Sequence, residues 1–284
     1  MQVLVSGVNG FIGSRLRMAM QEKGWEVIPL ERKDFALDAH ILGIKLSGAD
    51  VIIHLAGAPI VHRWNEAYKK ELRNSRINTT RKLVEALSLE REKPILFIST
   101  SAIGIYSATG SHSEVSSSTA DDFIGKLCLD WEKEAVHAAS ITRTVIFRLG
   151  IVLAKDGGAF PKMLLPFKFG LGGKIGSGKQ GFSWIHIDDL IAAYLFVIDN
   201  VEMNGAINLT SPEPCNNAEF TNTLATLIRR PAFFTVPLFA LKLIYGEGAT
   251  AVTGGQTVIP DRLMKAGFGY NFPTLAKALA NILK

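Results

Sequence analysis

The chain of 284 residues has only two cysteines, Cys128 and Cys215, which lie far apart in the sequence. A disulfide framework or a zinc site needs clustered ligands, so neither is expected and no metal is predicted. The longest apolar run, 233–245, is too short to span a bilayer and is interrupted by Pro237 and Lys242. No charged and apolar leader precedes the first predicted strand. These absences favour a cytoplasmic protein with no membrane partner.

The chain also lacks long runs of one charge. The 31 Lys and Arg residues exceed the 26 Asp and Glu residues and give a net charge of +5, but the densest basic groups, 31–33 and 69–71, include acids. This pattern is typical of a solvated surface, so no nucleic acid partner is predicted. There are no repeats or low-complexity segments. A hydrophobic content of 48% fits a globular enzyme with a sizeable core.

Apolar runs typical of strands alternate with segments of helical periodicity, which predicts an α/β fold with a parallel sheet wrapped by helices. The predicted strands are 3–5, 26–30, 51–55, 95–98, 144–147 and 206–209. The predicted helices are 14–23, 73–89, 122–139, 188–197 and 218–229.

The alternation weakens along the second half of the chain. Residues 107–120 are rich in Ser and Thr and predict a loop or flap. We expect residues 1–232 to form the nucleotide-binding domain, with substrate-side loops in 150–210. Residues 233–284 predict a small, mainly helical C-terminal domain.

A glycine-rich turn follows the first predicted strand and opens the first helix. Its spacing is that of a dinucleotide-binding turn, in which the glycines permit a tight turn, close approach of a pyrophosphate, and helix–strand packing. The helix N-terminus then offers free N–H groups to the phosphates; the alternative is a tight turn without a ligand. The expected cofactor contacts are Gly7, Asn9, Gly10, Phe11, Ile12 and Gly13.

The second predicted strand ends at Glu31, Arg32 and Lys33, about twenty residues after the glycine turn. An acid there accepts hydrogen bonds from the ribose of NAD, whereas an Arg pairs with the 2′-phosphate of NADP. Arg32 makes NADP(H) the favoured cofactor over NAD(H). A surface charge cluster is the alternative.

The next two strands end in small and hydroxyl-bearing residues. Leu55, Ala56 and Gly57 leave room for a cofactor across the strand ends, and Ser99 and Ser101 place hydroxyls at the same edge.

Together these segments resemble the extended short-chain dehydrogenase/reductase superfamily, in its sugar-nucleotide-epimerase-like branch. The landmarks are 5–13, 51–57, 99–106, 148–150 and 182–189. Residues 58–60, 130–132, 163–167, 182–190 and 258–268 resemble a bacterial family with a small C-terminal domain of unknown function; some members are labelled cell-division inhibitors. The resemblance implies a Rossmann-like doubly wound sheet, a cofactor contact at Gly150, a nicotinamide near Ser101, and a homodimer as one option.

The chain departs from the superfamily where a Tyr and a Lys normally move the proton. No Tyr lies in 122–130, and the two positions align with either Phe123 and Leu127 or Asp122 and Lys126. The second alignment keeps a Lys, although an ion pair between Asp122 and Lys126 on a helix surface explains it more simply.

The remaining candidates come from the same resemblance. Ser101 is expected to polarise a carbonyl, and Tyr106 and Lys126 are the other catalytic candidates. Tyr106 as a packed aromatic is the alternative. Trp184 and His186 are substrate candidates, with a structural histidine as the alternative. We predict an NADP(H)-dependent epimerase or oxidoreductase acting on a small polar substrate, a nucleotide sugar being one candidate. The rival hypothesis is a sensor that holds the cofactor without turnover.

Overall fold

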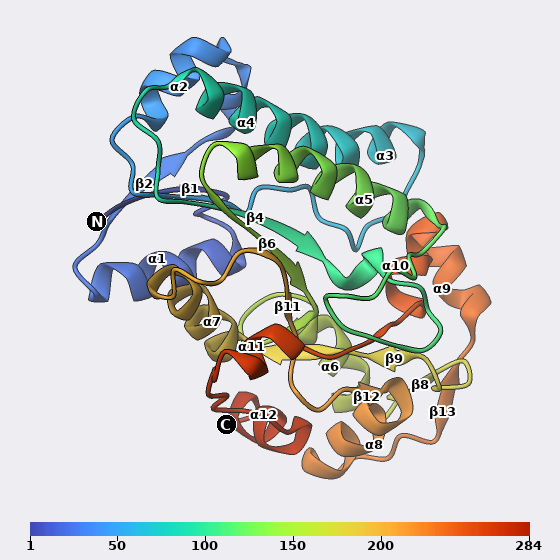
Figure 1. Cartoon of the computed structure of the whole chain (residues 1–284). Coiled ribbons are helices and arrows are strands. Elements are labelled where there is room, and N and C mark those ends of the chain that lie inside the picture. The colour runs from blue at the N-terminus through green and yellow to red at the C-terminus, as the bar shows by residue number, and fades with distance from the viewer.

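A computed structural model describes residues 1–284 and contains a central six-stranded sheet (Figure 1). Every neighbouring pair in this sheet is parallel. In the order in which they lie, its strands are β11 (Gly205–Leu209), β6 (Arg143–Leu149), β4 (Leu96–Ala102), β3 (Val51–His54), β1 (Gln2–Ser6) and β2 (Glu26–Leu30). The parallel α/β sheet predicted from the apolar runs is confirmed.

The strand order reverses at β1. Leu4 of β1 is aligned with Ile28 of β2 on one side and with Ile52 of β3 on the other. The chain therefore winds outward from β1 in two directions. In open parallel sheets, ligands bind outside the carboxyl ends of the strands at such a switch point, which lies here between β1 and β3.

Helices cover both faces of the sheet (Figure 1). One face carries α2 (Ala39–Leu46), α3 (Glu66–Arg73), α4 (Thr79–Leu89) and α5 (Phe123–Val136), and the other carries α1 (Phe11–Glu22) and α7 (Ile187–Asp199). Alternate strand residues point to opposite faces. Val3 therefore packs in one core cluster with Leu16 of α1, while Leu4 packs in another with Leu42 of α2. The central strands are buried on both faces, as their unbroken apolar runs predicted.

A continuous helical run, residues 66–89, crosses the face of the sheet that also carries α2 and α5. It consists of α3, a π-helical segment, η2 (Asn74–Asn78), and α4. The predicted helix at 73–89 thus begins earlier, because Asn65 caps α3 by accepting the backbone N–H of Tyr68 at 2.8 Å. Single π-helical turns are frequent at functional sites.

Shorter elements complete the chain. The single-turn helices are η1 (Arg32–Ala36), η3 (Ile103–Ile105), η4 (His137–Ser140) and η5 (Glu247–Ala249). The paired short strands are β7 (Ile151–Leu153) with β10 (Trp184–His186), β9 (Gly181–Phe182) with β12 (Cys215–Asn216), β8 (Gly173–Ile175) with β13 (Phe234–Val236), and β5 (Ser111–His112) with β14 (Thr257–Val258). The later helices are α6 (Phe160–Lys168), α8 (Asn217–Leu227), α9 (Leu238–Tyr245), α10 (Thr250–Thr253), α11 (Asp261–Lys265) and α12 (Leu275–Ile282).

The C-terminal tail is woven into the rest of the chain. Its strand β14 pairs with β5, inside the segment 107–120 that was predicted as a loop. The buried carboxylate of Asp189 accepts the backbone N–H groups of Asn271 and Phe272 at 2.8 and 2.9 Å. Such bonds fix the tail against α7. None of the helices is both long and apolar enough to cross a membrane.

Candidate functional site

The turn between β1 and α1 depends on its glycines. Gly7 has a φ of 71°, in the left-handed region that favours glycine, and a Cβ there would lie 3.1 Å from the backbone of Ala56. A Cβ on Gly13 would lie 2.2 Å from the carbonyl oxygen of Gly7. A larger residue at position 13 would therefore push the start of α1 away from β1.

The first turn of α1 presents free hydrogen-bond donors. Its N-cap, Gly10, has no side chain, and the amides of Phe11, Ile12 and Gly13 donate no hydrogen bond within the chain. No acidic residue occupies this first turn, and Asn9 and Gly10 are exposed beside it. Free N–H groups at the positive end of a helix dipole form an anion site.

A buried hydrogen-bond relay joins the ends of β1 and β3. Ser6 Oγ accepts the amides of Leu55 and Ala56 at 3.1 and 3.2 Å, so its hydroxyl donates to Nδ1 of His54 at 2.6 Å. His54 Nε2 then donates to Thr79 Oγ1 at 3.1 Å. Burial lowers the pKa of His54 to about 3, so the ring is neutral. The relay fixes the backbone of Leu55 and Ala56 at the switch point.

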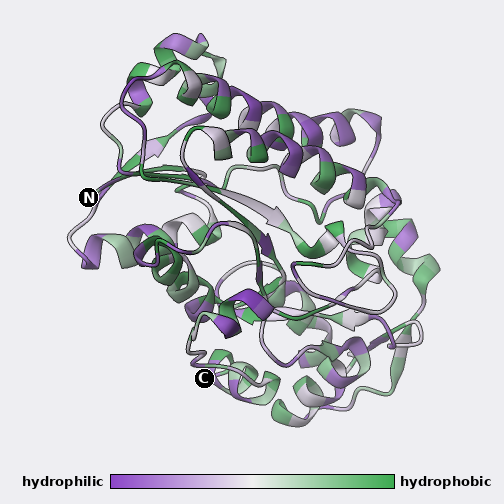
Figure 2. Cartoon of the chain, in the orientation of Figure 1, coloured by the Kyte–Doolittle hydropathy of each residue, from purple (hydrophilic) through white to green (hydrophobic).

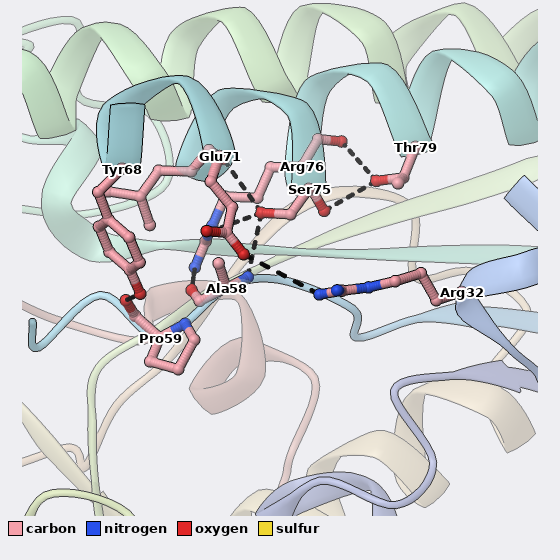
Figure 3. Close-up of polar contacts among 9 residues, drawn as sticks. Arg32, Ala58, Pro59, Tyr68, Glu71, Ser75, Arg76 and Thr79 are labelled. Atoms are coloured by element: carbon pink, nitrogen blue, oxygen red, sulfur yellow. Dashed lines mark hydrogen bonds and ion pairs between the residues drawn. The ribbon is translucent and has the colours of Figure 1, made fainter. Parts of the chain in front are cut away.

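A pocket of about 360 Å³ opens beside the end of β2, between Arg32 and the helical run (Figure 3). Nη2 of Arg32 lies 4.0 Å from Oε1 of Glu71 across it, and the Arg32 side chain is 93% exposed. The cations of Arg32 and Lys70, with nearby amide and hydroxyl groups, suit a phosphate ester, whereas Glu71 opposes it. The lining residues are Arg32, Ala67, Lys70, Glu71, Asn74, Ser75 and Thr79.

The two charged neighbours of Arg32 are engaged elsewhere. Glu31 pairs with Lys33 at 2.7 Å, a contact that raises the pKa of Lys33. Glu31 also caps η1, because its side chain accepts the backbone N–H of Asp34. Of the three charged residues at the end of β2, Arg32 is therefore the one that lines the pocket.

The π-helical segment holds the loop after β3 (Figure 3). Ser75 Oγ accepts the amide of Ala58 at 3.0 Å, and Nη2 of Arg76 donates to the carbonyl of Ala58 at 2.8 Å. A Cβ on Gly57 would lie 3.0 Å from the guanidinium carbon of Arg76. Burial lowers the pKa of Arg76, and no carboxylate pairs with it. A cation with only neutral partners therefore stands beside Gly57.

Two buried hydroxyls of β4, those of Ser99 and Ser101, lack hydrogen-bond partners. Ser99 is 1% exposed and Ser101 3% exposed, and neither Oγ forms a hydrogen bond. Ser101 lies beside Cys128, whose thiol has a pKa raised to about 12 by burial and is thus unreactive. An unpaired buried hydroxyl costs about 1–3 kcal/mol, so a bound ligand group would stabilise these side chains.

The start of α5 has the positions where a Tyr and a Lys would stand. Asp122 is the N-cap and accepts the amide of Gly125 at 2.8 Å. Leu127 is buried, and Phe123 packs edge-on against Trp64 with ring centroids 5.3 Å apart. Phe123 and Leu127 cannot donate or accept a proton, and the alternative pair, Asp122 and Lys126, has a carboxylate in place of the phenol, so the Tyr of the usual relay is absent under either alignment.

The ion pair expected between Asp122 and Lys126 is wrong. Lys126 Nζ instead lies 3.0 Å from Asp121, because the carboxylate of Asp122 faces the free amides of the helix start. Both members of the observed pair are exposed. A catalytic role for Lys126 stays a prediction.

Tyr106 lies in a buried polar network. Its hydroxyl donates to Asn208 at 2.9 Å and accepts from Nη1 of Arg148 at 2.7 Å. Arg148 is in turn held by Glu132, with Nη2 2.7 Å from a carboxylate oxygen. Burial raises the pKa of Tyr106. The geometry favours the packed aromatic over a proton donor.

Trp184 and His186 are buried in the interior, and Gly150 is half-buried. Trp184 is fully buried, and the ring of His186 stacks on Phe272 with centroids 3.9 Å apart. His186 Nδ1 accepts the backbone N–H at the start of α7, and burial lowers the pKa of the ring. A Cβ on Gly150 would lie 2.7 Å from the carbonyl oxygen of Ser183. These contacts favour structural roles for the two substrate candidates.

The structure thus brings most predicted cofactor residues to one edge of the sheet. The glycine turn, Arg32 and the 55–57 loop stand at or just beyond the carboxyl ends of β1, β2 and β3, and Ser99 of β4 is aligned with His54, the last residue of β3. Sequence reasoning missed the pocket residues of the helical run, Lys70, Glu71, Asn74, Ser75 and Thr79. Their spacing of three and four residues on one helical face was the available signal.

Two family models and a human protein match this chain. Residues 3–210 match the NAD dependent epimerase/dehydratase family, and residues 236–282 match a domain of unknown function, DUF1731. The chain is 36% identical to the human epimerase family protein SDR39U1, with 100% of each chain covered. The crystal structure of that human protein with NADPH has a TM-score of 0.91 at 35% identity and 99% coverage of both chains.

A nucleoside-diphosphate sugar epimerase from Corynebacterium glutamicum is also similar. It has a TM-score of 0.82 at 31% identity, and the match covers 100% of this chain and 58% of that one.

Proposed function

The chain belongs to the NAD dependent epimerase/dehydratase family, and from this premise we propose that it binds NADP(H) across the ends of β1, β2 and β3. The observation that carries the proposal is the Arg32 pocket beside the open start of α1. The NADPH bound to the human relative supports the same choice of cofactor.

The residues present fit the cofactor. The free amides of Phe11, Ile12 and Gly13 would hold the pyrophosphate, and Arg32 and Lys70 would hold the 2′-phosphate. The 55–57 loop, fixed by the Ser6 relay, would border the adenosine half. The unpaired hydroxyls of Ser99 and Ser101 would face the nicotinamide half.

The proposed chemistry uses few residues. When bound, the nicotinamide gives or takes a hydride. Ser101 would donate its hydroxyl proton in a hydrogen bond to the substrate carbonyl and orient it. Because Asn208 and Arg148 occupy the hydroxyl of Tyr106, we assign the proton transfer to water. The nucleoside-diphosphate sugar epimerase among the similar structures supports a small polar substrate of the nucleotide-sugar class.

A second function is favoured by one observation. No Tyr stands at the start of α5, where the resemblance aligns the Tyr and Lys of a working member with either Phe123 and Leu127 or Asp122 and Lys126. A protein that holds NADP(H) without turnover, as a sensor, fits this replacement. Absorbance at 340 nm of the complex with NADPH, followed during addition of nucleotide sugars and simple carbonyl compounds, separates the two. A loss of absorbance, or an epimerised sugar detected by NMR at constant absorbance, supports the enzyme. A constant signal with the added sugars unchanged supports the sensor.

Calorimetric titration tests the binding proposal. We expect NADPH to bind more tightly than NADH, and Arg32→Ala to weaken NADPH binding by about tenfold to a hundredfold while leaving NADH unchanged. Lys33→Ala is the matched control, because Lys33 is the neighbouring exposed cation paired with Glu31. Equal losses in both variants, or equal affinities for both cofactors, would remove the assigned role of Arg32.

A further inference from the structure

One part of the molecule, beside the loop that follows β3, exposes a concentration of apolar side chains. Helix α9 is almost entirely apolar and has no buried residue (Figure 2). Phe233 is 90% exposed, Phe239 74% and Leu243 75%. Phe169, just after α6, is 73% exposed. Water-exposed aromatic and aliphatic groups at this density mark an interaction surface.

These side chains come from two segments that lie side by side. Strand β13 pairs with β8, so that Phe234 is aligned with Gly173. A Cβ on Gly176 would lie 3.3 Å from the side chain of Leu238, at the start of α9. We call this surface, formed by α6, β8, the turn before β13, β13 and α9, the apolar-basic face.

The two segments that build the apolar-basic face are rich in cations. Neither segment that builds it, 157–187 or 229–246, contains an Asp or Glu. Seven cations are exposed on these segments: Lys162, Lys168, Lys174, Lys179, Arg229, Arg230 and Lys242. A pocket of about 420 Å³ at the end of α8 includes two of these cations, Arg229 and Arg230, and the ring of Phe233.

The positive charge of the apolar-basic face distinguishes between two candidate partners, a second copy of this chain and an anionic surface. A symmetric dimer would press the same patch of two copies together, placing cations against cations. An anionic, apolar partner satisfies both features, since aromatic side chains can enter its apolar layer while lysines extend to its negative groups. We propose that the apolar-basic face docks the protein peripherally on an anionic phospholipid surface.

This inference revises the expectation of no membrane partner. That expectation came from the absence of a spanning segment, and no helix here spans a membrane. Peripheral docking needs only exposed apolar groups and nearby cations. The exposed apolar and basic side chains of this face do not belong to the glycine turn or the Arg32 pocket, so their substitution leaves the residues assigned to the cofactor unchanged.

Sedimentation with vesicles tests the proposal. The full chain at about 0.1 M salt is mixed with vesicles of phosphatidylglycerol and phosphatidylcholine, or of phosphatidylcholine alone. We expect more than about 25-fold stronger partitioning onto the anionic vesicles, since the face carries more than two cations at about fivefold each. Phe233→Ser with Phe239→Ser should lower that partitioning at least about tenfold. Lys174→Gln with Lys242→Gln should lower it about 25-fold, at about fivefold for each cation.

The controls are Val115→Ser and Lys133→Gln. Val115 is an exposed apolar residue in the loop after β5, and Lys133 is an exposed lysine on α5. Both should partition like the unaltered protein. Absence of partitioning onto anionic vesicles overturns the proposal, as does equal loss in the controls. A dimer in sedimentation velocity that Phe239→Ser dissociates, or an acidic protein that binds this face when vesicles do not, also overturns it.

Discussion

The Arg32 pocket makes a prediction in which removing a charge should strengthen binding. Glu71 is the one acid in a pocket that we assign to the 2′-phosphate, and its carboxylate lies 4.0 Å from Nη2 of Arg32. The phosphate must displace this carboxylate and then lie near its charge. Two unit charges 4 Å apart in a water-like dielectric interact by about 1 kcal/mol. Glu71→Gln should therefore tighten NADPH binding about fivefold.

The assay is calorimetric titration of both cofactors into the variant at low salt. NADH has no 2′-phosphate, so its affinity should stay the same, and the ratio of the two affinities should rise about fivefold. The gain should shrink at about 1 M salt, where the Debye length falls to about 3 Å. Glu66→Gln is the control, since Glu66 lies on the same helix but pairs with Lys69 outside the pocket.

Two outcomes of the Glu71→Gln titrations would contradict a 2′-phosphate bound beside Glu71. An equal gain for NADH and NADPH would mean that Glu71 acts on a group common to both cofactors. An unchanged or weakened affinity for NADPH would mean that the 2′-phosphate does not enter the pocket.

Three further predictions concern the elements around the pocket. Gly13→Ala places a methyl group 2.2 Å from the Gly7 carbonyl oxygen, so it should lower the Tm by several degrees in thermal unfolding and abolish cofactor binding in calorimetry. Gly269→Ala is the control and should change neither, because a Cβ there has no atom within 4 Å. The depressed pKa of His54 means that the unfolded chain takes up a proton below pH 6.5 that the folded chain refuses until about pH 3. As the pH is lowered from 6.5 to 3, the free energy of unfolding should thus fall by up to about 1.4 kcal/mol per pH unit. In urea titrations at several pH values, His54→Gln should show a weaker dependence of this free energy on pH. The same pH dependence in the variant and the unaltered protein would contradict the prediction. Ser101→Ala removes an unpaired buried hydroxyl, so it should keep or raise the Tm, keep NADPH affinity and abolish any turnover; retained turnover would exclude Ser101.

The sheet was predictable because its strands carry strong local signals. Val51, Ile52 and Ile53 form an unbroken apolar run, as a strand buried on both faces must, and all three are fully buried. The glycine spacing likewise identified the turn, because each glycine there is required by a close backbone contact. Local pattern and tertiary structure agree in these elements.

The elements and contacts that the sequence did not predict depend on segments that are distant in the chain. Strands β13 and β14 are too short for an alternating pattern and exist because they pair with β8 and β5. The start of α3 was missed because its residues are mostly charged, so no apolar stripe marks it. The neighbours of Tyr106, Arg148 and Asn208, are far from it in sequence, and only the fold places them on its hydroxyl.

In the proposed complex the pyrophosphate of NADPH lies on the first turn of α1 and its 2′-phosphate lies in the Arg32 pocket. A crystal structure of the NADPH complex tests this most directly. We expect pyrophosphate oxygens within hydrogen-bond distance of the Phe11 to Gly13 amides and a 2′-phosphate bonded to Arg32 in place of Glu71. A cofactor bound elsewhere, or a 2′-phosphate in solvent with the Arg32–Glu71 pair intact, would contradict it.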